Sequence, residues 1–316
     1  MLCDQSKLRI LVIKHGALGD IVQGFDAFAS LRTGYPKANI SLMTSKGFVS
    51  LAKMMPWFDD VILDSRSGPL NFVANFRVWR HLHQNWSLIV DMQCSRRTKS
   101  YFSYLSKSGT RWVGTATGCS DPLPDFEGVN NRQRMIITAE MAGGICQTAD
   151  MDWLDTHSAT SQSDCLIDED KAYAVMVPGC SLAKPQKRWP ARHFANVAND
   201  LLARGFMVHL VGTEEDRKAI DSVLAYAPRA TDLCGKTDLT GLTQLMKRAS
   251  YVIGNDTGPI FLSAKIGAPT LMIMGPDTDP TMSAPTGRAC KWLRGMPISG
   301  ITEKAVLNAL CDLDGS

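Results

Sequence analysis

The sequence predicts an α/β protein built from two Rossmann-like parallel-sheet domains that face each other across a cleft. Apolar runs with the length of buried strands alternate with segments whose apolar residues recur at helical spacing. This alternation occurs twice, on the two sides of a stretch at 155–170 that is rich in Asp, Ser and Thr. Strand–helix alternation implies parallel sheets with right-handed crossovers. We therefore expect domains at 1–158 and 172–316, a linker at 159–171, and ligands in the cleft at the carboxyl ends of the strands.

The first half opens with a continuous apolar run at 8–13, which is expected to be a strand buried on both faces. A helix is predicted over 20–32 because Ile21, Phe25 and Phe28 share one of its faces. The same patterns predict a strand at 39–44, a helix at 48–55, a strand at 60–63, a helix at 71–85, and strands at 87–91 and 111–114.

The second half repeats the alternation after the polar stretch. It begins with an apolar strand at 172–177 and ends with a helix at 303–310. Between them we expect a helix at 193–204, a strand at 206–211, helices at 214–227 and 240–248, a strand at 251–253, a helix at 260–266 and a strand at 270–274.

The composition is that of a globular protein, with 45% hydrophobic and 21% charged residues. Nine cysteines without a C-x-x-C pair favour reduced thiols over a zinc site or a disulfide framework. No apolar run has the roughly 18 residues of a membrane helix, and no basic leader precedes the first strand. A cytoplasmic protein is therefore expected.

The net charge of +3 lies entirely in the first half of the chain. Residues 1–160 hold 17 Lys or Arg against 14 Asp or Glu, whereas the remaining residues hold 17 of each. The excess is either a sign of an anionic partner for the first half or a chance scatter of surface charge.

The first motif, at 14–22, connects the first strand to the first helix. Its glycines allow a tight turn and a close approach to a ligand, and Asp20 is expected at or near the helix N-cap. A cap alone and a functional carboxylate are both compatible with this position. The dinucleotide fingerprint G-x-G-x-x-G is absent, which disfavours an oxidoreductase.

The second motif follows the first strand of the second half, as P-G-C-S at 178–181 and then K-R-W-P at 187–190. A glycine turn, a hydroxyl and a cationic pair fit a phosphate-binding loop, with Lys187 as the charge nearest a leaving phosphate. A solvated basic loop in front of a helix that begins at proline is the alternative.

The third motif, G-N-D-T-G-P at 254–259, also lies between a strand and a helix. Backbone N–H groups at the start of the helix and the Thr257 hydroxyl form a ready anion site. Asp256 suits a brace for the loop or a partner for a sugar hydroxyl. This cluster is richer than a simple helix cap needs.

Together and in this order, the three motifs resemble glycosyltransferase family 9, the lipopolysaccharide heptosyltransferases, over residues 8–290. The motif G-A-P-T at 267–270 and Gly275-Pro276 belong to the same ordered set. The resemblance implies a GT-B fold and a metal-independent enzyme that inverts the anomeric centre without a cofactor. It also implies an ADP-heptose donor on the second domain, and a lipopolysaccharide-core acceptor on the first.

The resemblance implies catalytic roles for Asp20 as general base and Lys187 at the diphosphate. The donor-binding residues that it implies are Gly19, Gly179, Ser181, Thr213, Glu214, Asp256, Thr257 and Gly258. Basic residues of the first half are candidates for contact with an anionic saccharide or lipid-linked acceptor, namely Lys14, His15, Arg66, Arg96, Arg97 and Lys99. Such an acceptor would bring the enzyme to the inner face of the inner membrane, and no nucleic-acid partner is expected.

Two positions depart from the family pattern. Phe261 stands where D-T-G-x-x-H has its histidine, and Phe25-Asp26 replaces a proline in the first helix. The alternatives are therefore a UDP-sugar transferase or epimerase of similar architecture, and a binding module that keeps the fold without catalysis.

Overall fold

The apolar run of the first half forms β1 (Arg9–Ile13), the central strand of a parallel sheet. Its side chains from Ile10 to Ile13 are at most 1% exposed, because helices cover both faces of the sheet. β1 pairs with β2 on one side and with β4 on the other. The computed structural model describes residues 5–68, 71–105, 109–156, 171–181 and 184–313, and the chain divides into two units, Met1–Trp153 and Leu154–Ser316.

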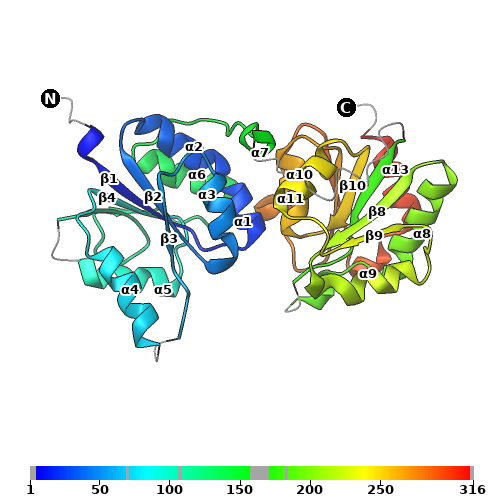
Figure 1. Ribbon diagram of the computed structural model, residues 1–316, viewed down its shortest axis with the longest axis horizontal. Helices are drawn as coiled ribbons and strands as arrows, with labels where there is room; N and C mark the ends of the chain where they lie inside the picture. The colour runs from blue at the N-terminus through cyan, green and yellow to red at the C-terminus, as the bar shows by residue number, and fades with distance from the viewer. Residues whose placement is uncertain (1–4, 69–70, 106–108, 157–170, 182–183, 314–316) are drawn as a thin grey trace. The chain divides into compact units, whose positions relative to one another are not determined.

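The first unit is a six-stranded parallel sheet in the order β3-β2-β1-β4-β5-β6 (Figure 1). Helices α2 and α6 pack together with α1, and α4 packs against α5 on the opposite face. The other strands are β2 (Asn39–Thr44), β3 (Asp60–Leu63), β4 (Leu88–Asp91), β5 (Arg111–Gly114) and β6 (Asp121–Pro122). The helices are α1 (Leu18–Gln23), α2 (Phe25–Gly34), α3 (Val49–Met54), α4 (Phe72–Leu82), α5 (Arg96–Leu105) and α6 (Asn131–Met141), and α7 (Trp153–Thr156) begins at the last residue of this unit.

The single helix predicted over 20–32 is in fact two helices, α1 and α2, which meet at Gly24. A Cβ at this position would lie 2.9 Å from the ring of Phe28, so glycine permits a close contact there. Glycine is also unfavourable inside a helix, which explains why the chain breaks at this residue.

The second unit has the same topology, with strand order β12-β11-β10-β7-β8-β9. Its strands are β7 (Tyr173–Val177), β8 (Met207–Gly212), β9 (Thr231–Cys234), β10 (Tyr251–Asn255), β11 (Thr270–Met274) and β12 (Cys290–Arg294). Its helices are α8 (Ala191–Ala203), α9 (Arg217–Leu224), α10 (Leu239–Lys247), α11 (Gly258–Lys265), α12 (Pro280–Ser283) and α13 (Glu303–Cys311). The helix predicted at 214–227 begins instead as a 3-10 turn at Glu214–Asp216.

Both strand orders are those of a doubly wound Rossmann sheet. The order reverses between β1 and β4 in the first unit and between β7 and β10 in the second. Loops at the carboxyl ends of these four strands flank the crevice where such sheets bind ligands. Of the predicted linker, residues 159–170 lie outside the described residues.

Asp26 of α2, one of the two departures from the family pattern, is buried and ties three parts of the first unit together. One of its carboxylate oxygens lies 2.6 Å from Nε of Arg132 on α6. The other accepts the backbone N–H of Ala149 at 2.8 Å. Asp26 is therefore a structural residue of this unit.

We expect Asp26→Ala to lower the free energy of unfolding of the first unit by about 3 kcal/mol, because it leaves a partly buried guanidinium without its partner. Asp59→Ala is the matched control: Asp59 binds Arg32 with a side chain that is 45% exposed, and its loss should cost about 1 kcal/mol. Urea unfolding of both variants measures the difference. Equal losses would contradict the structural role of Asp26.

Candidate functional site

Asp20 lies in the first turn of α1, three residues after the N-cap residue Ala17. The N-cap position is occupied by Ala17, so Asp20 lies inside the first turn of the helix and is not its N-cap residue. Its half-buried carboxylate accepts a hydrogen bond from the Asn131 amide of α6 at 3.2 Å. The carboxylate is thus held beside the loop that follows the central strand.

Lys14 and His15, at the start of the same loop, are both buried. The Lys14 ammonium lies 3.5 Å from the backbone oxygen of Met92, which follows β4. Burial lowers the pKa of Lys14, and the charge of Asp20 partly offsets this effect. Lys14 and Asp20 are therefore coupled electrostatically within the first unit.

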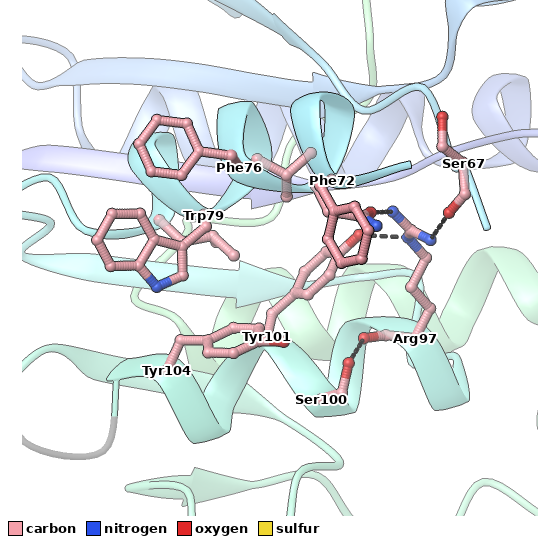
Figure 2. Close-up of a pocket in the computed structure, with 11 residues that line it drawn as sticks. Ser67, Phe72, Phe76, Trp79, Arg97, Ser100, Tyr101 and Tyr104 are labelled. Carbon is pink, nitrogen blue, oxygen red and sulfur yellow. Dashed lines mark hydrogen bonds between the residues drawn. The ribbon is translucent and has the colours of Figure 1, made fainter. Parts of the chain in front are cut away.

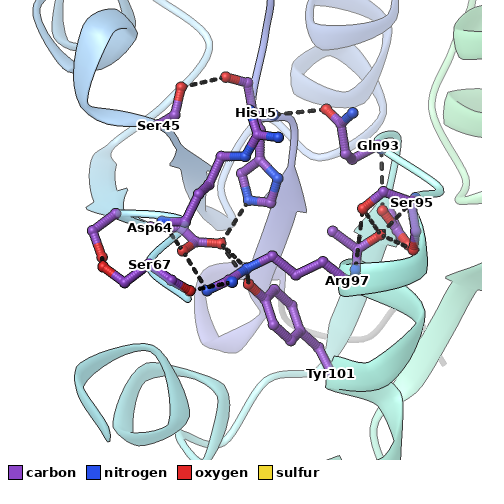
Figure 3. Close-up of polar contacts among 12 residues, drawn as sticks. His15, Ser45, Asp64, Ser67, Gln93, Ser95, Arg97 and Tyr101 are labelled. Atoms are coloured by element: carbon purple, nitrogen blue, oxygen red, sulfur yellow. Dashed lines mark hydrogen bonds and ion pairs between the residues drawn. The ribbon is translucent and has the colours of Figure 1, made fainter. Parts of the chain in front are cut away.

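His15 belongs to a polar cluster centred on Asp64, which is fully buried after β3 (Figure 3). Nε2 of His15 lies 2.9 Å from Asp64, and the Tyr101 hydroxyl donates to the same carboxylate at 2.5 Å. Arg97 contacts Asp64 at 3.1 Å and donates to the Ser67 backbone oxygen at 2.8 Å. The cluster joins the loops after β1 and β3 to α5.

Burial by itself would raise the pKa of Asp64. Hydrogen bonds from His15, Tyr101 and the Arg66 backbone outweigh burial, so the pKa of Asp64 lies well below its usual range. Burial likewise raises the pKa of Asp91, at the end of β4. The ionised Asp64 is therefore the anionic centre of this edge of the sheet.

In the second unit, the buried Asn255 at the end of β10 connects the two predicted donor loops. Its amide donates to the backbone oxygen of Pro178 at 2.8 Å, and its side-chain oxygen accepts the backbone N–H of Trp189 at 2.9 Å. The segment G-N-D-T-G-P is thereby held beside P-G-C-S and K-R-W-P, which precede it by more than 60 residues.

Lys187 and Asp256 form an ion pair in this assembly. The Thr278 hydroxyl donates to the same carboxylate oxygen of Asp256 at 2.7 Å. Both side chains of the ion pair are largely buried, so the ammonium of Lys187 is held beside the N-terminus of α11. Thr257 is the N-cap residue of α11 but makes no side-chain capping bond.

The remaining donor candidates meet around Asp216. Thr213 forms a capping box with Asp216, with a hydroxyl-to-carboxylate distance of 3.1 Å. A Cβ at Gly179 would lie 2.1 Å from Asp216, which explains the need for glycine there. Glu214 and Ser181 are exposed beside them.

The structure thus brings Lys187, Asp256, Thr257 and Gly258 together, places Gly179 and Thr213 around Asp216, and puts Gly19 and Asp20 in the other unit. Among the acceptor candidates, Arg66, Arg96 and Lys99 are exposed, Arg97 is engaged by Asp64, and Lys14 and His15 are buried.

Sequence reasoning missed several polar residues of this site. Asn131 and Arg134 lie on α6, a helix that was not predicted, and they act on Asp20 and Lys14. No local sequence pattern indicated the contacts of Asp64, Asp216 and Thr278. The position of Asn255 did indicate a role, because this residue lies in a motif directly after a buried strand.

The described residues contain no group of three or more His, Cys, Asp or Glu that could hold a metal ion. No helix in the described parts of the chain combines the length and apolar content needed to cross a membrane.

Solved structures of the same fold include the ADP-heptose LPS heptosyltransferase II of E. coli. It is 20% identical, with a TM-score of 0.78 over 97% of this chain and 98% of that one. The E. coli heptosyltransferase WaaC with ADP is 17% identical, with a TM-score of 0.77 over 97% and 100% of the two chains. The two doubly wound units therefore have the GT-B fold of glycosyltransferases.

The model of glycosyltransferase family 9 (heptosyltransferase) matches residues 135–299. The lipooligosaccharide heptosyltransferase 2 of Haemophilus influenzae is 23% identical over 303 residues, covering 88% of this chain and 86% of that protein. The chain belongs to glycosyltransferase family 9.

The Asp64 cluster predicts a pH-dependent contribution to stability. Because the pKa of Asp64 is lowered by folding, its contribution is complete above the unfolded pKa of about 4 and is lost as the pH falls toward the folded pKa. Asp64→Asn should therefore cost about 3 kcal/mol at pH 7, and less at acidic pH.

Urea unfolding at neutral and acidic pH checks this prediction. Asp125→Asn, at an exposed position of the same unit, should change stability by less than about 0.5 kcal/mol at either pH. A constant difference between Asp64→Asn and the wild type across pH would contradict the role of the ionised carboxylate.

Proposed function

We propose that this glycosyltransferase moves heptose from ADP-heptose to a lipopolysaccharide-core-type acceptor, with inversion at the anomeric carbon and without a bound metal. Asp20 carries the proposal, because it is a half-buried carboxylate at the sheet's switch point that its helix does not use as a cap. The names of the similar proteins supply the sugar, the nucleotide and the acceptor class.

In the proposed reaction, Asp20 accepts the proton of a hydroxyl group of the acceptor. The oxygen of that hydroxyl group forms a bond to the anomeric carbon of the donor sugar. The bond from that carbon to the diphosphate breaks on the opposite face, and ADP leaves with the electron pair. The transition state has oxocarbenium character, as in other glycosyl transfers. Asn131 orients the base through its hydrogen bond at 3.2 Å.

Residues of the second unit stabilise the negative charge that develops on the leaving diphosphate in the proposed reaction. Lys187 offers a positive charge at a site shielded from water, where electrostatic stabilisation is strong. The N-terminal N–H groups of α11, with Thr257 and Gly258, provide further donors for the phosphates. The rest of the donor would be held by the loops after β7 and β8, which contain Gly179, Ser181, Thr213 and Glu214. Gly19, next to Asp20 in the first unit, is proposed as a further donor contact.

We assign acceptor binding to the first domain, 1–158, and donor binding to the second, 172–316. Arg66 and Arg96 are exposed and suit the acidic groups of the acceptor. Arg97 and His15 hold the underlying loops through Asp64, and Lys14 acts from the interior. A lipid-linked acceptor would place the enzyme at the inner face of the inner membrane.

Phe261 bears on the choice of donor. It is buried on α11, one turn after the phosphate-facing end of the helix, so its ring cannot donate a hydrogen bond as a histidine would. The proposed diphosphate contacts come instead from Lys187 and the backbone.

Asp20→Asn is expected to reduce kcat by about 10²–10⁴-fold, the usual contribution of a positioned general base, while ADP affinity stays the same. Transfer is measured with ADP-heptose and a core acceptor, and ADP binding by calorimetry. Asp59→Asn, at an exposed carboxylate of the same unit, is the control and should keep full activity. Turnover of Asp20→Asn close to wild type would exclude the assigned base.

ADP should raise thermal stability more than UDP, which separates the proposal from a UDP-sugar enzyme. At about 100 times its Kd, ADP should add about 2.7 kcal/mol to the free energy of unfolding. Lys187→Met should weaken this effect, whereas Lys304→Met at an exposed position of the same unit should leave it unchanged. A larger shift with UDP would overturn the choice of donor.

A further inference from the structure

The face formed by α4 and α5 of the first unit exposes an unusual number of large apolar side chains. Phe72 and Phe76 of α4 are 76% and 60% exposed, and Val73, Trp79 and Tyr104 are also exposed. Half of the exposed large hydrophobic residues in the described parts of the chain lie on these two helices. A large exposed apolar surface of this kind usually marks an interaction site.

The aromatic residues of α4 form a ridge along one side of the helix. Phe72, Phe76 and Trp79 are spaced by four and three residues, so they share a face. The rings of Phe76 and Trp79 are stacked with their centroids 5.5 Å apart, and Trp79 in turn contacts His83. The ridge is therefore held in an exposed arrangement by its own contacts.

A cavity of about 680 Å³ lies beside this ridge, between α4 and α5 (Figure 2). Phe72, Trp79 and Tyr104 line its apolar part, and Arg97 and Ser67 line its polar part. The cavity can accept an apolar chain, and Arg97 in its lining is paired with Asp64.

The charged side chains of α4 and α5 are all basic. From residue 65 to residue 120 the sequence holds eight Lys or Arg and one carboxylate, Asp91, which is fully buried. Arg77 and Arg80 are exposed on α4, and Arg96 and Lys99 on α5. The preceding exposed carboxylates along the chain, Asp59 and Asp60, already contact Arg32 and Asn39. This segment accounts for the basic excess of the first half of the chain.

We propose that the α4–α5 face binds the surface of an anionic lipid bilayer, with Phe72, Phe76 and Trp79 inserted among the headgroups. Helices that lie in a membrane interface combine exposed aromatic residues with flanking cations in this way. The aromatic ridge favours a bilayer over a nucleic acid, which would need polar contacts to its backbone and bases. The inference rests on the proposed function only for its biological setting, because bilayer binding requires neither donor nor acceptor.

Co-sedimentation of the full chain with vesicles tests the proposal. The chain should bind vesicles of phosphatidylethanolamine and phosphatidylglycerol and fail to bind phosphatidylcholine vesicles. Binding should weaken as NaCl rises from about 0.05 to 0.5 M, because salt screens surface charge. Absence of binding to the anionic vesicles would overturn the proposal, whatever the outcome of the transfer assays.

Variants of the face separate its two components. The double variant Phe76→Ser with Trp79→Ser should lower the vesicle partition coefficient at least 10-fold. Arg77→Gln with Arg80→Gln should lower it about 5-fold for each charge, the effect of one basic residue near an anionic membrane. The matched controls lie in the second unit: Trp292→Ser at an exposed tryptophan, and Arg229→Gln with Arg288→Gln, should bind like wild type.

Thermal unfolding shows whether each variant is folded. If the double variant Phe76→Ser with Trp79→Ser does not fold, Phe72→Ser, at the most exposed of these residues, takes its place. Equal binding by the face variants and the controls would overturn the proposal. So would a wild-type dimer that these substitutions dissociate without any vesicle binding, since the ridge would then contact a second copy of the chain. Binding to a DNA duplex in place of vesicles would assign the face to a nucleic acid.

Discussion

The arrangement of the loops at the proposed donor site depends on one buried carboxamide, that of Asn255. By bonding to the backbone at Pro178 and at Trp189, it joins the loop after β10 to the loop after β7, which lies more than 60 residues earlier in the chain. Lys187 lies two residues before Trp189, and Asp256 is the next residue after Asn255, so this amide also sets where their ion pair forms. A buried amide with satisfied donors and acceptors is well suited to such a task, because any other arrangement of the loops would leave polar groups unpaired.

In the first unit, the loops at the carboxyl edge of the sheet are held together by a buried carboxylate instead of an amide. Asp64 is fully buried, yet its carboxylate is contacted by His15, Tyr101 and Arg97, and it stays ionised because of these contacts. The desolvation of one buried carboxylate is costly unless hydrogen bonds satisfy it. Each unit therefore has a fully buried polar group at the carboxyl edge of its sheet: Asn255 ends β10, where the strand order reverses, and Asp64 follows β3, at the end of the first sheet.

Much of the fold follows from local pattern. The central strands, such as β1 and β11, are continuous apolar runs, and the loops that follow β1, β7 and β10 contain the glycines and polar residues of the three motifs. The elements that were missed have weaker patterns: α5 contains six polar or charged residues in ten, and β12 is half exposed. The partners of Asp20 and Asp64 could not be predicted, because Asn131 lies 111 residues from Asp20 and Arg97 lies 33 residues from Asp64.

The shared strand order has a consequence for how members of such a family can diverge. In both units the proposed catalytic residues follow the strands at the middle of the sheet, whereas β3, β6, β9 and β12 lie at the margins. Substitutions at the margins change surfaces without moving the reacting groups. The sequence can therefore drift to about one-fifth identity with its relatives while the centre of each sheet keeps its geometry, and an exposed helix surface such as that of α4 and α5 is free to acquire a character of its own.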